Sequence, residues 1–291
     1  MLPSIDLGFI ELPLYGLMFL IGFVLAVLMI RRIAPKTGVG KDDALFASIY
    51  GVIGLLIGAK VLYFITKVPG IIKNFDIIVD MFRKNEGSTW SLIEYFLMDW
   101  FGGMVFYGGL IGFCFGVWRY CAHFKVNLFN IADLYTPFLP FAHAFGRIGC
   151  FCAGCCYGVE YHGFLSVQFP YNEISPELSE VPRLPVQLIE AGLNFVCFGI
   201  LLYLMLKNVR LPEEKRWLKK GQLLGFYLTY YLVIRTVLEF FRGDSVRGSV
   251  GFLSTSQIIS LLLIPAAIYF ILAKNRSRIF MYAKADSSVD K

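Results

Sequence analysis

The most regular feature of the chain is a series of apolar runs, each separated from the next by a short polar or charged segment. A helix that crosses the hydrocarbon core of a bilayer needs about 20 mostly apolar residues. The runs that approach this length are Leu14–Ile30, Ala44–Ile65, Gly103–Tyr120, Phe129–Phe145, Val186–Leu206, Leu223–Phe241 and Leu253–Leu272. The pattern predicts an all-α fold, a polytopic transmembrane helical bundle with about seven spans, in which residues 1–291 form a single domain.

Two segments depart from this pattern. The fourth run contains Asp133, Pro137 and Pro140, and we expect its helix to be kinked or partly broken because proline removes a backbone donor. We expect the carboxylate of Asp133 to complement the dipole at a helix N-terminus. The stretch Ile77–Phe96 is too charged to span a bilayer, and we interpret it as an outer loop with an amphipathic piece.

Basic residues concentrate in alternate loops. They follow the first, third, fifth and last runs: Arg31, Arg32, Lys36, Lys41, Arg119, Lys125, Lys207, Arg210, Lys215, Arg216, Lys219, Lys220, Lys274, Arg276, Arg278 and Lys284. Loops rich in Lys and Arg remain on the cytoplasmic side. We therefore predict that the N-terminus lies outside and the C-terminus inside. The N-terminal residues lack the basic segment and the small-residue cleavage site of a signal peptide.

Composition agrees with a membrane protein. Hydrophobic residues make up 57% of the 291, whereas globular chains are roughly 45–50% apolar. The net charge of +6 does not indicate nucleic-acid binding, because the basic residues form short clusters beside apolar runs. No nucleic-acid partner is expected.

A polar stripe lies on the sixth run. Tyr231, Arg235, Glu239 and Arg242 are spaced by 4, 4 and 3 residues, so they share one face of a helix. Such a face must lie against protein, water or a ligand rather than hydrocarbon. One interpretation is a structural ion pair between Arg235 and Glu239. The other is an anion site, because two arginines for one carboxylate leave surplus positive charge, and the arginine fork suits a phospholipid phosphate.

Other polar residues lie at the same predicted level of the bilayer. Lys60 and Arg147 either extend to the interface or belong to the same site. Tyr15, Gln187, Glu190 and Gln257 stand at the beginnings of runs, and each by itself is interpreted as a helix-end residue. Because the cytoplasmic halves hold no comparable set, the outer half is the predicted location of the site.

The segment Gly146–Gly158 contains four of the seven cysteines, at positions 150, 152, 155 and 156, and we place it just beyond the outer end of the fourth helix. Three interpretations remain open: metal binding with His143 or His162 as further ligands, a disulfide facing an oxidising exterior, or small packing residues with one polar thiol. The spacing favours packing, because only one cysteine cluster exists. We expect no metal and no cofactor.

A second glycine-rich segment, Phe101–Gly112, has Tyr107 at its centre. Glycines at such spacing are typical of close helix packing. The segment is not a nucleotide-binding phosphate loop, because no Lys-Ser/Thr follows the glycines.

Several motifs occur in an order and spacing that resemble the prolipoprotein diacylglyceryl transferase family of bacterial membrane enzymes. They are YGLMFLIGF from Tyr15, GGMVFYGGLIG from Gly102, PFAHAFGRIGCF from Pro140, LPVQLIE from Leu184, RTVLEFFRGD from Arg235 and STSQIIS from Ser254. The resemblance implies a multi-pass transferase domain in the bacterial plasma membrane with its active site toward the outer face. It also implies transfer of the diacylglyceryl group of phosphatidylglycerol to the lipobox cysteine of a prolipoprotein signal peptide, among membrane lipids.

The resemblance also implies roles for individual residues. Arg147 matches a phosphatidylglycerol-binding arginine, and Arg235 with Glu239 matches an essential basic–acidic pair. Tyr15, Arg242, Lys60 and Gly158 are assigned to substrate binding. Tyr107 and His143 are the candidate catalytic residues besides the basic–acidic pair.

The chain departs from the family motifs at several positions, which resembles a divergent branch with a cysteine signature. Tyr107 replaces a histidine, Cys150 an asparagine and Cys155 an acidic residue, while Lys60 replaces an arginine and Leu184 a histidine. A tyrosine with an ordinary pKa of about 10 is a poor base at neutral pH. His143, one turn before Arg147, is either the substitute base or a packed core histidine.

Two alternatives to this function remain open. One is a glycerolipid-group transferase with a different acceptor, and the other is a lipid-binding membrane protein without catalysis. Transport is disfavoured, because no inverted repeat is present and polar residues do not follow a path through both halves of the bilayer.

Overall fold

The computed structural model describes residues 4–6, 8, 11–73, 103–171, 179–243, 249–250 and 253–272. Its elements are β1 (Ser4–Asp6), β2 (Glu11–Pro13), α1 (Leu14–Ile33), η1 (Ala34–Thr37), α2 (Lys41–Lys73), α5 (Phe106–Phe124), α6 (Leu128–Tyr135), α7 (Phe138–Ala153), α8 (Val186–Val209), η3 (Glu213–Lys215), α9 (Gln222–Glu239), β3 (Ser249–Val250), β4 (Leu253–Ser254) and α10 (Thr255–Leu272). Helices account for most of the described chain, as predicted. The predicted loop Ile77–Phe96 and the basic residues after position 272 lie outside the described residues.

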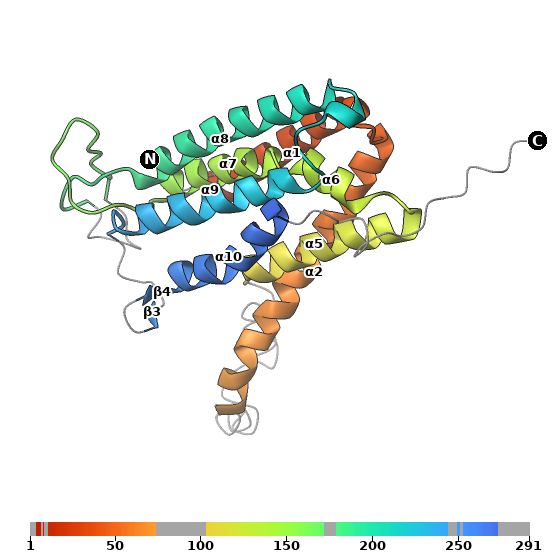
Figure 1. Ribbon diagram of the computed structural model, residues 1–291. Helices are drawn as coiled ribbons and strands as arrows, with labels where there is room; N and C mark the ends of the chain where they lie inside the picture. The colour runs from red at the N-terminus through yellow and green to blue at the C-terminus, as the bar shows by residue number, and fades with distance from the viewer. Residues whose placement is uncertain are drawn as a thin grey trace, which may run out of the picture. The chain divides into compact units, whose positions relative to one another are not determined.

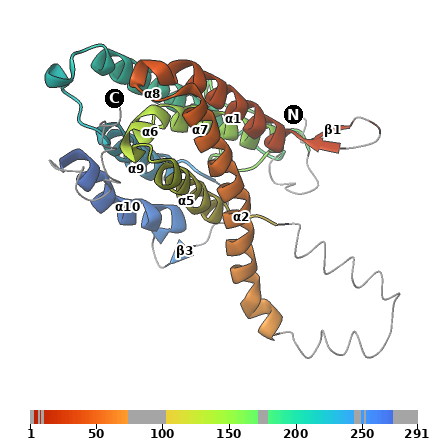
Figure 2. The ribbon, with the colours of Figure 1, turned by 90° about the vertical axis from the view of Figure 1, so that its right-hand side faces the viewer.

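Two short antiparallel hairpins are additions that the apolar pattern did not predict. Strands β1 and β2 pair with Ser4 opposite Pro13, and they lead directly into α1 (Figure 2). Strands β3 and β4 pair immediately before α10. In each case the strands are too short for their alternation to differ from that of a polar turn.

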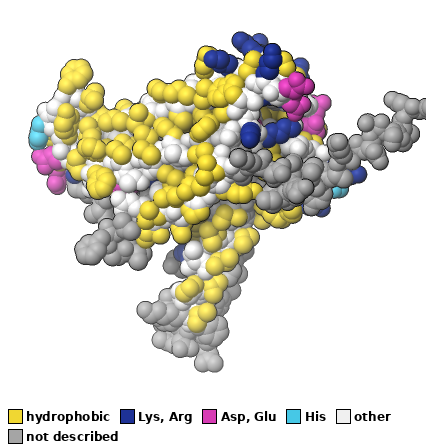
Figure 3. All heavy atoms as spheres, in the orientation of Figure 1, with side chains coloured by type: hydrophobic (Ala, Val, Ile, Leu, Met, Phe, Trp, Pro, Cys, Tyr) yellow, Lys and Arg dark blue, Asp and Glu magenta, His cyan; other side chains and the backbone are white. Residues whose placement is uncertain are grey.

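Three helical segments of the described chain are long and apolar enough to cross a membrane, Leu14–Thr37, Lys41–Gly70 and Val186–Val209. Phe138–Ala153 and Ser260–Leu272 are shorter apolar helices. Large apolar side chains lie exposed along these elements, for example Leu28, Ile57 and Ile200, each more than half exposed. Figure 3 shows such side chains covering much of the visible helical surface. This agrees with a membrane helical bundle, while the count of about seven spans and the orientation stay predictions.

The fourth predicted span is broken where the prolines indicated. Helix α6 ends at Tyr135 and α7 begins at Phe138, with Pro137 at its N-cap. At the break, the carbonyl of Ala132 accepts both the backbone N–H of Thr136 at 2.9 Å and its Oγ1–H at 2.7 Å. The predicted end of this span at Phe145 was wrong, because α7 continues to Ala153.

Asp133 acts at a helix N-terminus, but the helix is a distant one in the sequence. It lies in α6, and its Oδ2 accepts the backbone N–H of Gly221 at 2.7 Å. Gly221 is the N-cap of α9. The carboxylate therefore complements the positive end of α9, and it joins two segments 88 residues apart in the chain.

The described helices belong to two compact units. The first contains Met1–Lys41 and Phe129–Met281, and the second contains Asp42–Leu128 and Tyr282–Lys291. Within the first unit, neighbouring helices are in contact in the order α1, α7, α8, α9 and α10 (Figure 1). Gly22 permits the first of these contacts, because a Cβ there would lie 2.4 Å from Cβ of Phe145.

In the second unit, α2 and α5 approach backbone to backbone. A Cβ added at Gly54 would lie 2.1 Å from the carbonyl oxygen of Gly112, and one added at Gly58 would lie 2.3 Å from that of Gly108. No side chain fits at such distances. The glycine-rich segment around Tyr107 is therefore a close-packing surface, as its spacing predicted.

Candidate active site

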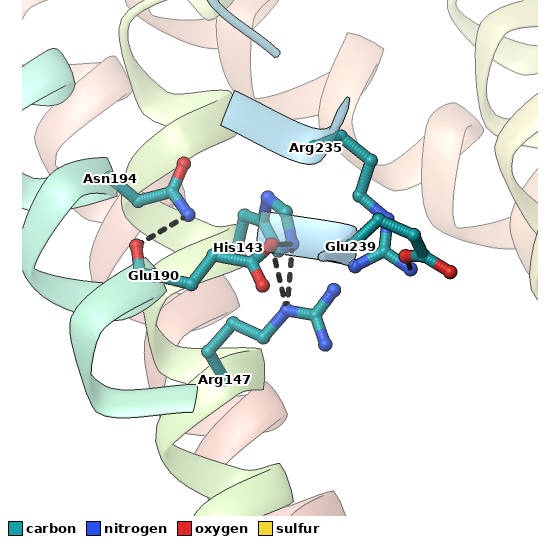
Figure 4. Close-up of polar contacts among 6 residues, drawn as sticks. All are labelled: His143, Arg147, Glu190, Asn194, Arg235 and Glu239. Carbon is teal, nitrogen blue, oxygen red and sulfur yellow. Dashed lines mark hydrogen bonds and ion pairs between the residues drawn. The ribbon is translucent and has the colours of Figure 1, made fainter. Parts of the chain in front are cut away.

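Three helices of the first unit place charged side chains in one cluster (Figure 4). Helix α7 supplies His143 and Arg147, α8 supplies Glu190, and α9 supplies Arg235 and Glu239. Each pair on a single helix is separated by four residues, so both members lie on the same face. The predicted grouping of Arg147 with Arg235 and Glu239 is thus present in the structure.

Arg147 is held by its Nε atom. Nε lies 3.0 Å from Oε1 of Glu190 and 3.2 Å from Nε2 of His143. Among the described residues, every hydrogen bond and ion pair of this guanidinium uses Nε. The two terminal NH₂ groups point away from the Glu190 carboxylate (Figure 4), and the side chain is 14% exposed. The side of the guanidinium that binds an oxyanion bidentately therefore remains available for a ligand.

Glu190 is the site residue that the sequence did not identify. We interpreted it as a helix-end residue, but it is 2% exposed and lies against both Arg147 and His143. A carboxylate on an apolar run was the signal, since a buried charge is retained only with a partner. Its partner could not be named, because Arg147 lies on another helix 43 residues earlier in the chain.

Aromatic packing fixes the contact between α7 and α8 beside this pair. The ring of Phe141 lies 4.9 Å from that of Phe198 and 5.8 Å from that of Phe195. Tightly packed rings resist relative movement of the two helices. The distance between Arg147 and Glu190 is therefore set by the core as well as by their attraction.

Arg235 and Glu239 form a second buried pair. Nη2 of Arg235 lies 3.1 Å from Oε2 of Glu239, and both side chains are 6% exposed. Arg147, Arg242 and Glu190 also act electrostatically on Arg235. The site therefore contains three arginines and two glutamates. From two arginines and one carboxylate we predicted a surplus of one positive charge. With three arginines and two glutamates the surplus is again one.

His143 contacts charged groups on two helices. Its Nε2 accepts the Nε–H of Arg147 at 3.2 Å and lies 3.4 Å from Oε1 of Glu190. Its ring is 6.0 Å from that of Tyr231. A general base needs a free lone pair facing its substrate, and the lone pair of Nε2 already faces Arg147. This geometry favours a role in positioning Arg147, while the predicted catalytic role stays a prediction.

Arg242 does not lie on the helix face where we placed it. Helix α9 ends at Glu239, and Arg242 follows its last turn in an antiparallel bridge with Gly158. The backbone changes direction there, so helical spacing no longer applies. Arg242 nevertheless acts electrostatically on Arg235 and on the thiol of Cys156.

Gly158 has a packing reason for being glycine. A Cβ at this position would lie 2.4 Å from the carbonyl oxygen of Leu184 and 2.7 Å from Cγ2 of Val186. Its N–H also donates to the carbonyl of Leu184 at 3.1 Å. At Gly158 the chain thus closely approaches the protein's own backbone, and its predicted role in substrate binding stays a prediction.

The cysteine segment begins inside α7 rather than beyond its end, which corrects its predicted place. Cys150 and Cys152 belong to the last turns of the helix, Gly154 ends it with a φ of 69°, and Cys155 and Cys156 follow. All four cysteines are free thiols. Hydrogen bonds from the Cys150 and Cys155 thiols lower the pKa of Cys156, and Arg242 and Arg147 lower it further.

Tyr15 lies beside the same segment. Its backbone packs on Gly149 of α7, where a Cβ would lie 3.1 Å from the Tyr15 carbonyl oxygen. The residue is 45% exposed. It is therefore close to the cysteine-rich end of α7, as expected for a residue at the start of α1.

Two predicted site residues, Lys60 and Tyr107, belong to the second unit. Nζ of Lys60 donates to the carbonyl of Gly103 at 3.0 Å and lies 5.9 Å from the ring centre of Tyr63. Tyr107 is in the first turn of α5 and packs edge-on against Phe106. Lys60, on the apolar helix α2, thus has a hydrogen-bond partner in the backbone of Gly103. The site roles of Lys60 and Tyr107 stay predictions.

A helical membrane protein with buried arginine–glutamate pairs between α7, α8 and α9 is the class that the fold and the site define. The family model of prolipoprotein diacylglyceryl transferase matches residues 3–273. The chain belongs to this family of bacterial membrane enzymes.

Relatives in several bacteria match over most of their length. The phosphatidylglycerol–prolipoprotein diacylglyceryl transferase of Clostridium tetani is 33% identical over 255 residues, which cover 88% of this chain and 90% of the relative. The second such enzyme of Clostridium perfringens is 33% identical over 86% of both chains. That of Legionella pneumophila is 29% identical over 93% of this chain and 96% of the relative.

Proposed function

We propose that this chain transfers the diacylglyceryl group of phosphatidylglycerol to the lipobox cysteine of prolipoproteins. The names of its relatives support this reaction and both substrates. The observation that carries the proposal is the geometry of Arg147, whose Nε is anchored to Glu190 while both terminal NH₂ groups remain available.

The arginine cluster suits the lipid substrate. In the reaction, the acceptor sulfur forms a bond to the glyceryl carbon of the lipid, and the bond from that carbon to the phosphate oxygen breaks. The electron pair leaves on glycerol phosphate. Arg147 binds the phosphate and stabilises the charge that develops on its oxygen, as fixed donors do in other sites where negative charge develops. Arg235 and Arg242 supply the surplus positive potential.

The two glutamates position the arginines. Glu190 holds Nε of Arg147, and Glu239 holds Nη2 of Arg235. Because each carboxylate neutralises one guanidinium, the cluster tolerates burial and still attracts an anion. Groups held in place before substrate arrives need no reorganisation during the reaction.

The membrane arrangement is part of the proposal. The chain is proposed to cross the bacterial plasma membrane about seven times with the N-terminus outside and the C-terminus inside. Basic residues support this orientation, and Figure 3 shows Lys and Arg side chains gathered at one end of the first unit. The cluster of Arg147 and Arg235 then lies toward the outer face, among membrane lipids.

A transfer assay with the purified full chain tests the function. It uses phosphatidylglycerol labelled in the diacylglyceryl group and a lipobox peptide as acceptor. We expect Arg147→Ala to lower the rate by about 10²–10³-fold, as for the loss of one donor to a developing oxyanion. Arg210→Ala is the control, because Arg210 is exposed at the opposite end of α8 from Glu190.

Three results would contradict the proposal. Full activity in Arg147→Ala would remove the phosphate site. Transfer to a small thiol but not to the peptide would indicate a related enzyme with another acceptor. Lipid binding without transfer would indicate a lipid-binding protein.

A further inference from the structure

Three of the four clustered cysteines meet in space. The Sγ atoms of Cys150, Cys155 and Cys156 all lie within 4.8 Å of one another. Cys152, two residues after Cys150 on the same helix, is not part of this group. We call the three residues the thiol cluster.

The backbone at the end of α7 builds the thiol cluster. Gly154 and Cys156 both have positive φ, 69° and 59°. The N–H of Cys155 donates to the carbonyl of Cys150 at 3.1 Å, so the chain folds back over the last turn of the helix. Nε2 of Gln187, on α8, donates to the carbonyl of Cys155 at 2.8 Å and fixes the turn from outside.

A positive φ at Cys156 is the notable part of this turn. Residues with a Cβ adopt that conformation rarely, and it persists where the surroundings impose it. Here it places a third sulfur next to the other two. The three sulfurs are therefore close enough together to bind one ion.

The spacing of the sulfurs fits a tetrahedral metal ion. Zinc binds thiolate at about 2.3 Å, so two sulfurs on one zinc lie roughly 3.8 Å apart. Side-chain rotations that shorten the sulfur–sulfur distances by no more than about 1 Å bring the cluster to that spacing. Three protein ligands with an open fourth position is the arrangement of catalytic rather than structural zinc sites.

Exposure and charge agree with an open site. Cys150 is buried, Cys156 is half-buried, and Cys155 is exposed, so the cluster is accessible from one side. Zinc with three thiolates carries one net negative charge. Arg147 and Arg242 both act electrostatically on Cys156 and offset that charge.

We propose that the thiol cluster binds a zinc ion whose fourth position takes the thiol of the acceptor substrate. This inference rests on the function proposed above, and it departs from the expectation of no metal that the sequence supported. Arg147, which binds the lipid phosphate in that proposal, and Arg242 both act electrostatically on Cys156 of the thiol cluster.

Zinc at this position would assist the removal of the proton from the acceptor thiol, a step for which the arginine cluster has no group. An acceptor thiol has an ordinary pKa of about 8.5 and must lose its proton, while Nε2 of His143 already faces Arg147. A thiol that coordinates zinc is deprotonated outright. The proton of the acceptor thiol would leave to solvent when the sulfur takes the fourth position.

The resulting thiolate then completes the reaction. Its sulfur forms the bond to the glyceryl carbon, and the carbon–oxygen bond to phosphate breaks with the electron pair on the leaving oxygen. The thioether product, which carries no charge on sulfur, would then leave the cluster. No oxidant or reductant is required.

The first test is metal content of the purified full chain, measured by elemental analysis after dialysis against zinc. We expect about one zinc per chain. Cys150→Ser, Cys155→Ser and Cys156→Ser each lower this ratio, and the triple variant abolishes it. Cys152→Ser retains full zinc content and serves as the matched control.

The second test needs no variant and so does not depend on folding of altered chains. Cobalt(II) replaces zinc in the wild-type protein, and the sulfur-to-cobalt charge-transfer absorption is recorded. Adding a lipobox peptide should intensify this absorption, because a fourth thiolate joins three. The same peptide with serine in place of its cysteine should leave the spectrum unchanged.

The third test is activity. Removing zinc with a chelator should lower transfer about a hundredfold or more, within the range for loss of proton-transfer assistance, and adding zinc should restore it. Zinc-free protein with full transfer overturns this inference and leaves the proposed function intact. Zinc-loaded protein that responds to the peptide spectroscopically but never transfers overturns the proposed function alone. Binding of copper(I) with zinc excluded, a disulfide among the three cysteines, or a spectrum indifferent to the peptide also overturns the inference.

Discussion

The two units of the chain stabilise their helix contacts in opposite ways. In the second unit, α2 and α5 meet through glycines whose backbones touch, for example Gly58 and Gly108. In the first unit, α7, α8 and α9 meet around buried charges, for example Arg147 and Glu190. Among the described residues, the buried charged side chains, Glu190, Arg235 and Glu239, all belong to the first unit. Burying a charge is costly, so such residues are expected at a site rather than in a scaffold.

The difference also determines what each region tolerates. A contact between glycine backbones fails when any side chain is added, whatever its chemistry. A contact between charges fails when one partner is removed, because the other remains buried without compensation.

The largest effect is expected for Arg235→Ala. Removing the guanidinium leaves the carboxylate of Glu239 buried beside it, and breaking such a pair costs about 3–5 kcal/mol. We expect transfer to be abolished and the protein to unfold at lower temperature. The double variant Arg235→Ala with Glu239→Gln should recover the thermal stability but not the transfer, measured by unfolding and by the labelled-lipid assay. Full activity in Arg235→Ala would mean that this pair has no part in the reaction.

A second, smaller effect is expected for Glu190→Gln. The amide keeps the shape and one acceptor oxygen but holds Nε of Arg147 with less strength. Misplacement of a positioning group by about 1 Å costs on the order of 10²-fold in rate. The rate of transfer should fall by about that factor, with the thermal stability changed less than in Arg235→Ala. An unchanged rate would show that Glu190 serves the fold alone.

The glycine contact should respond to volume only. In Gly58→Ala, the new Cβ would lie 2.3 Å from the carbonyl oxygen of Gly108, and forced overpacking of this kind costs about 1–3 kcal/mol. Gly199→Ala is the matched control, because nothing lies within 4 Å of a Cβ there and alanine favours the helix. Thermal unfolding should separate the two variants. Equal stability would contradict the close contact between α2 and α5.

The smallest effect is expected for Tyr107→Phe. Tyr107 lies in the second unit on the glycine-rich helix α5, where its ring packs edge-on against Phe106. We expect transfer to fall less than about tenfold, because proton transfer by a dedicated base is worth 10²–10⁴-fold. Total loss of transfer in this variant, combined with full activity in Arg235→Ala, would place the catalytic group in the second unit and leave the charged cluster of the first unit without a part in the reaction.

Local patterns in the sequence determined much of the fold. Apolar runs of helical length predicted helices α1, α2, α5 and α7 to α10, with ends that differ from those of the structure. Free backbone groups are costly to bury in a membrane, which leaves few alternatives to a helix. Prolines predicted the break at Pro137, and the spacing of four residues predicted the pair of Arg235 and Glu239. Each of these is a property of one helix, for which periodicity is sufficient evidence.

Contacts between helices and beyond helix ends were decided by the tertiary structure. Glu190 became a site residue because α7 and α8 pack side by side, and periodicity does not say which faces of two helices meet. Arg242 left the predicted helix face because α9 ends three residues earlier. Cys150, Cys155 and Cys156 meet because positive φ angles at Gly154 and Cys156 turn the chain back on α7. Such a turn brings sulfurs together in space without leaving any period in the sequence.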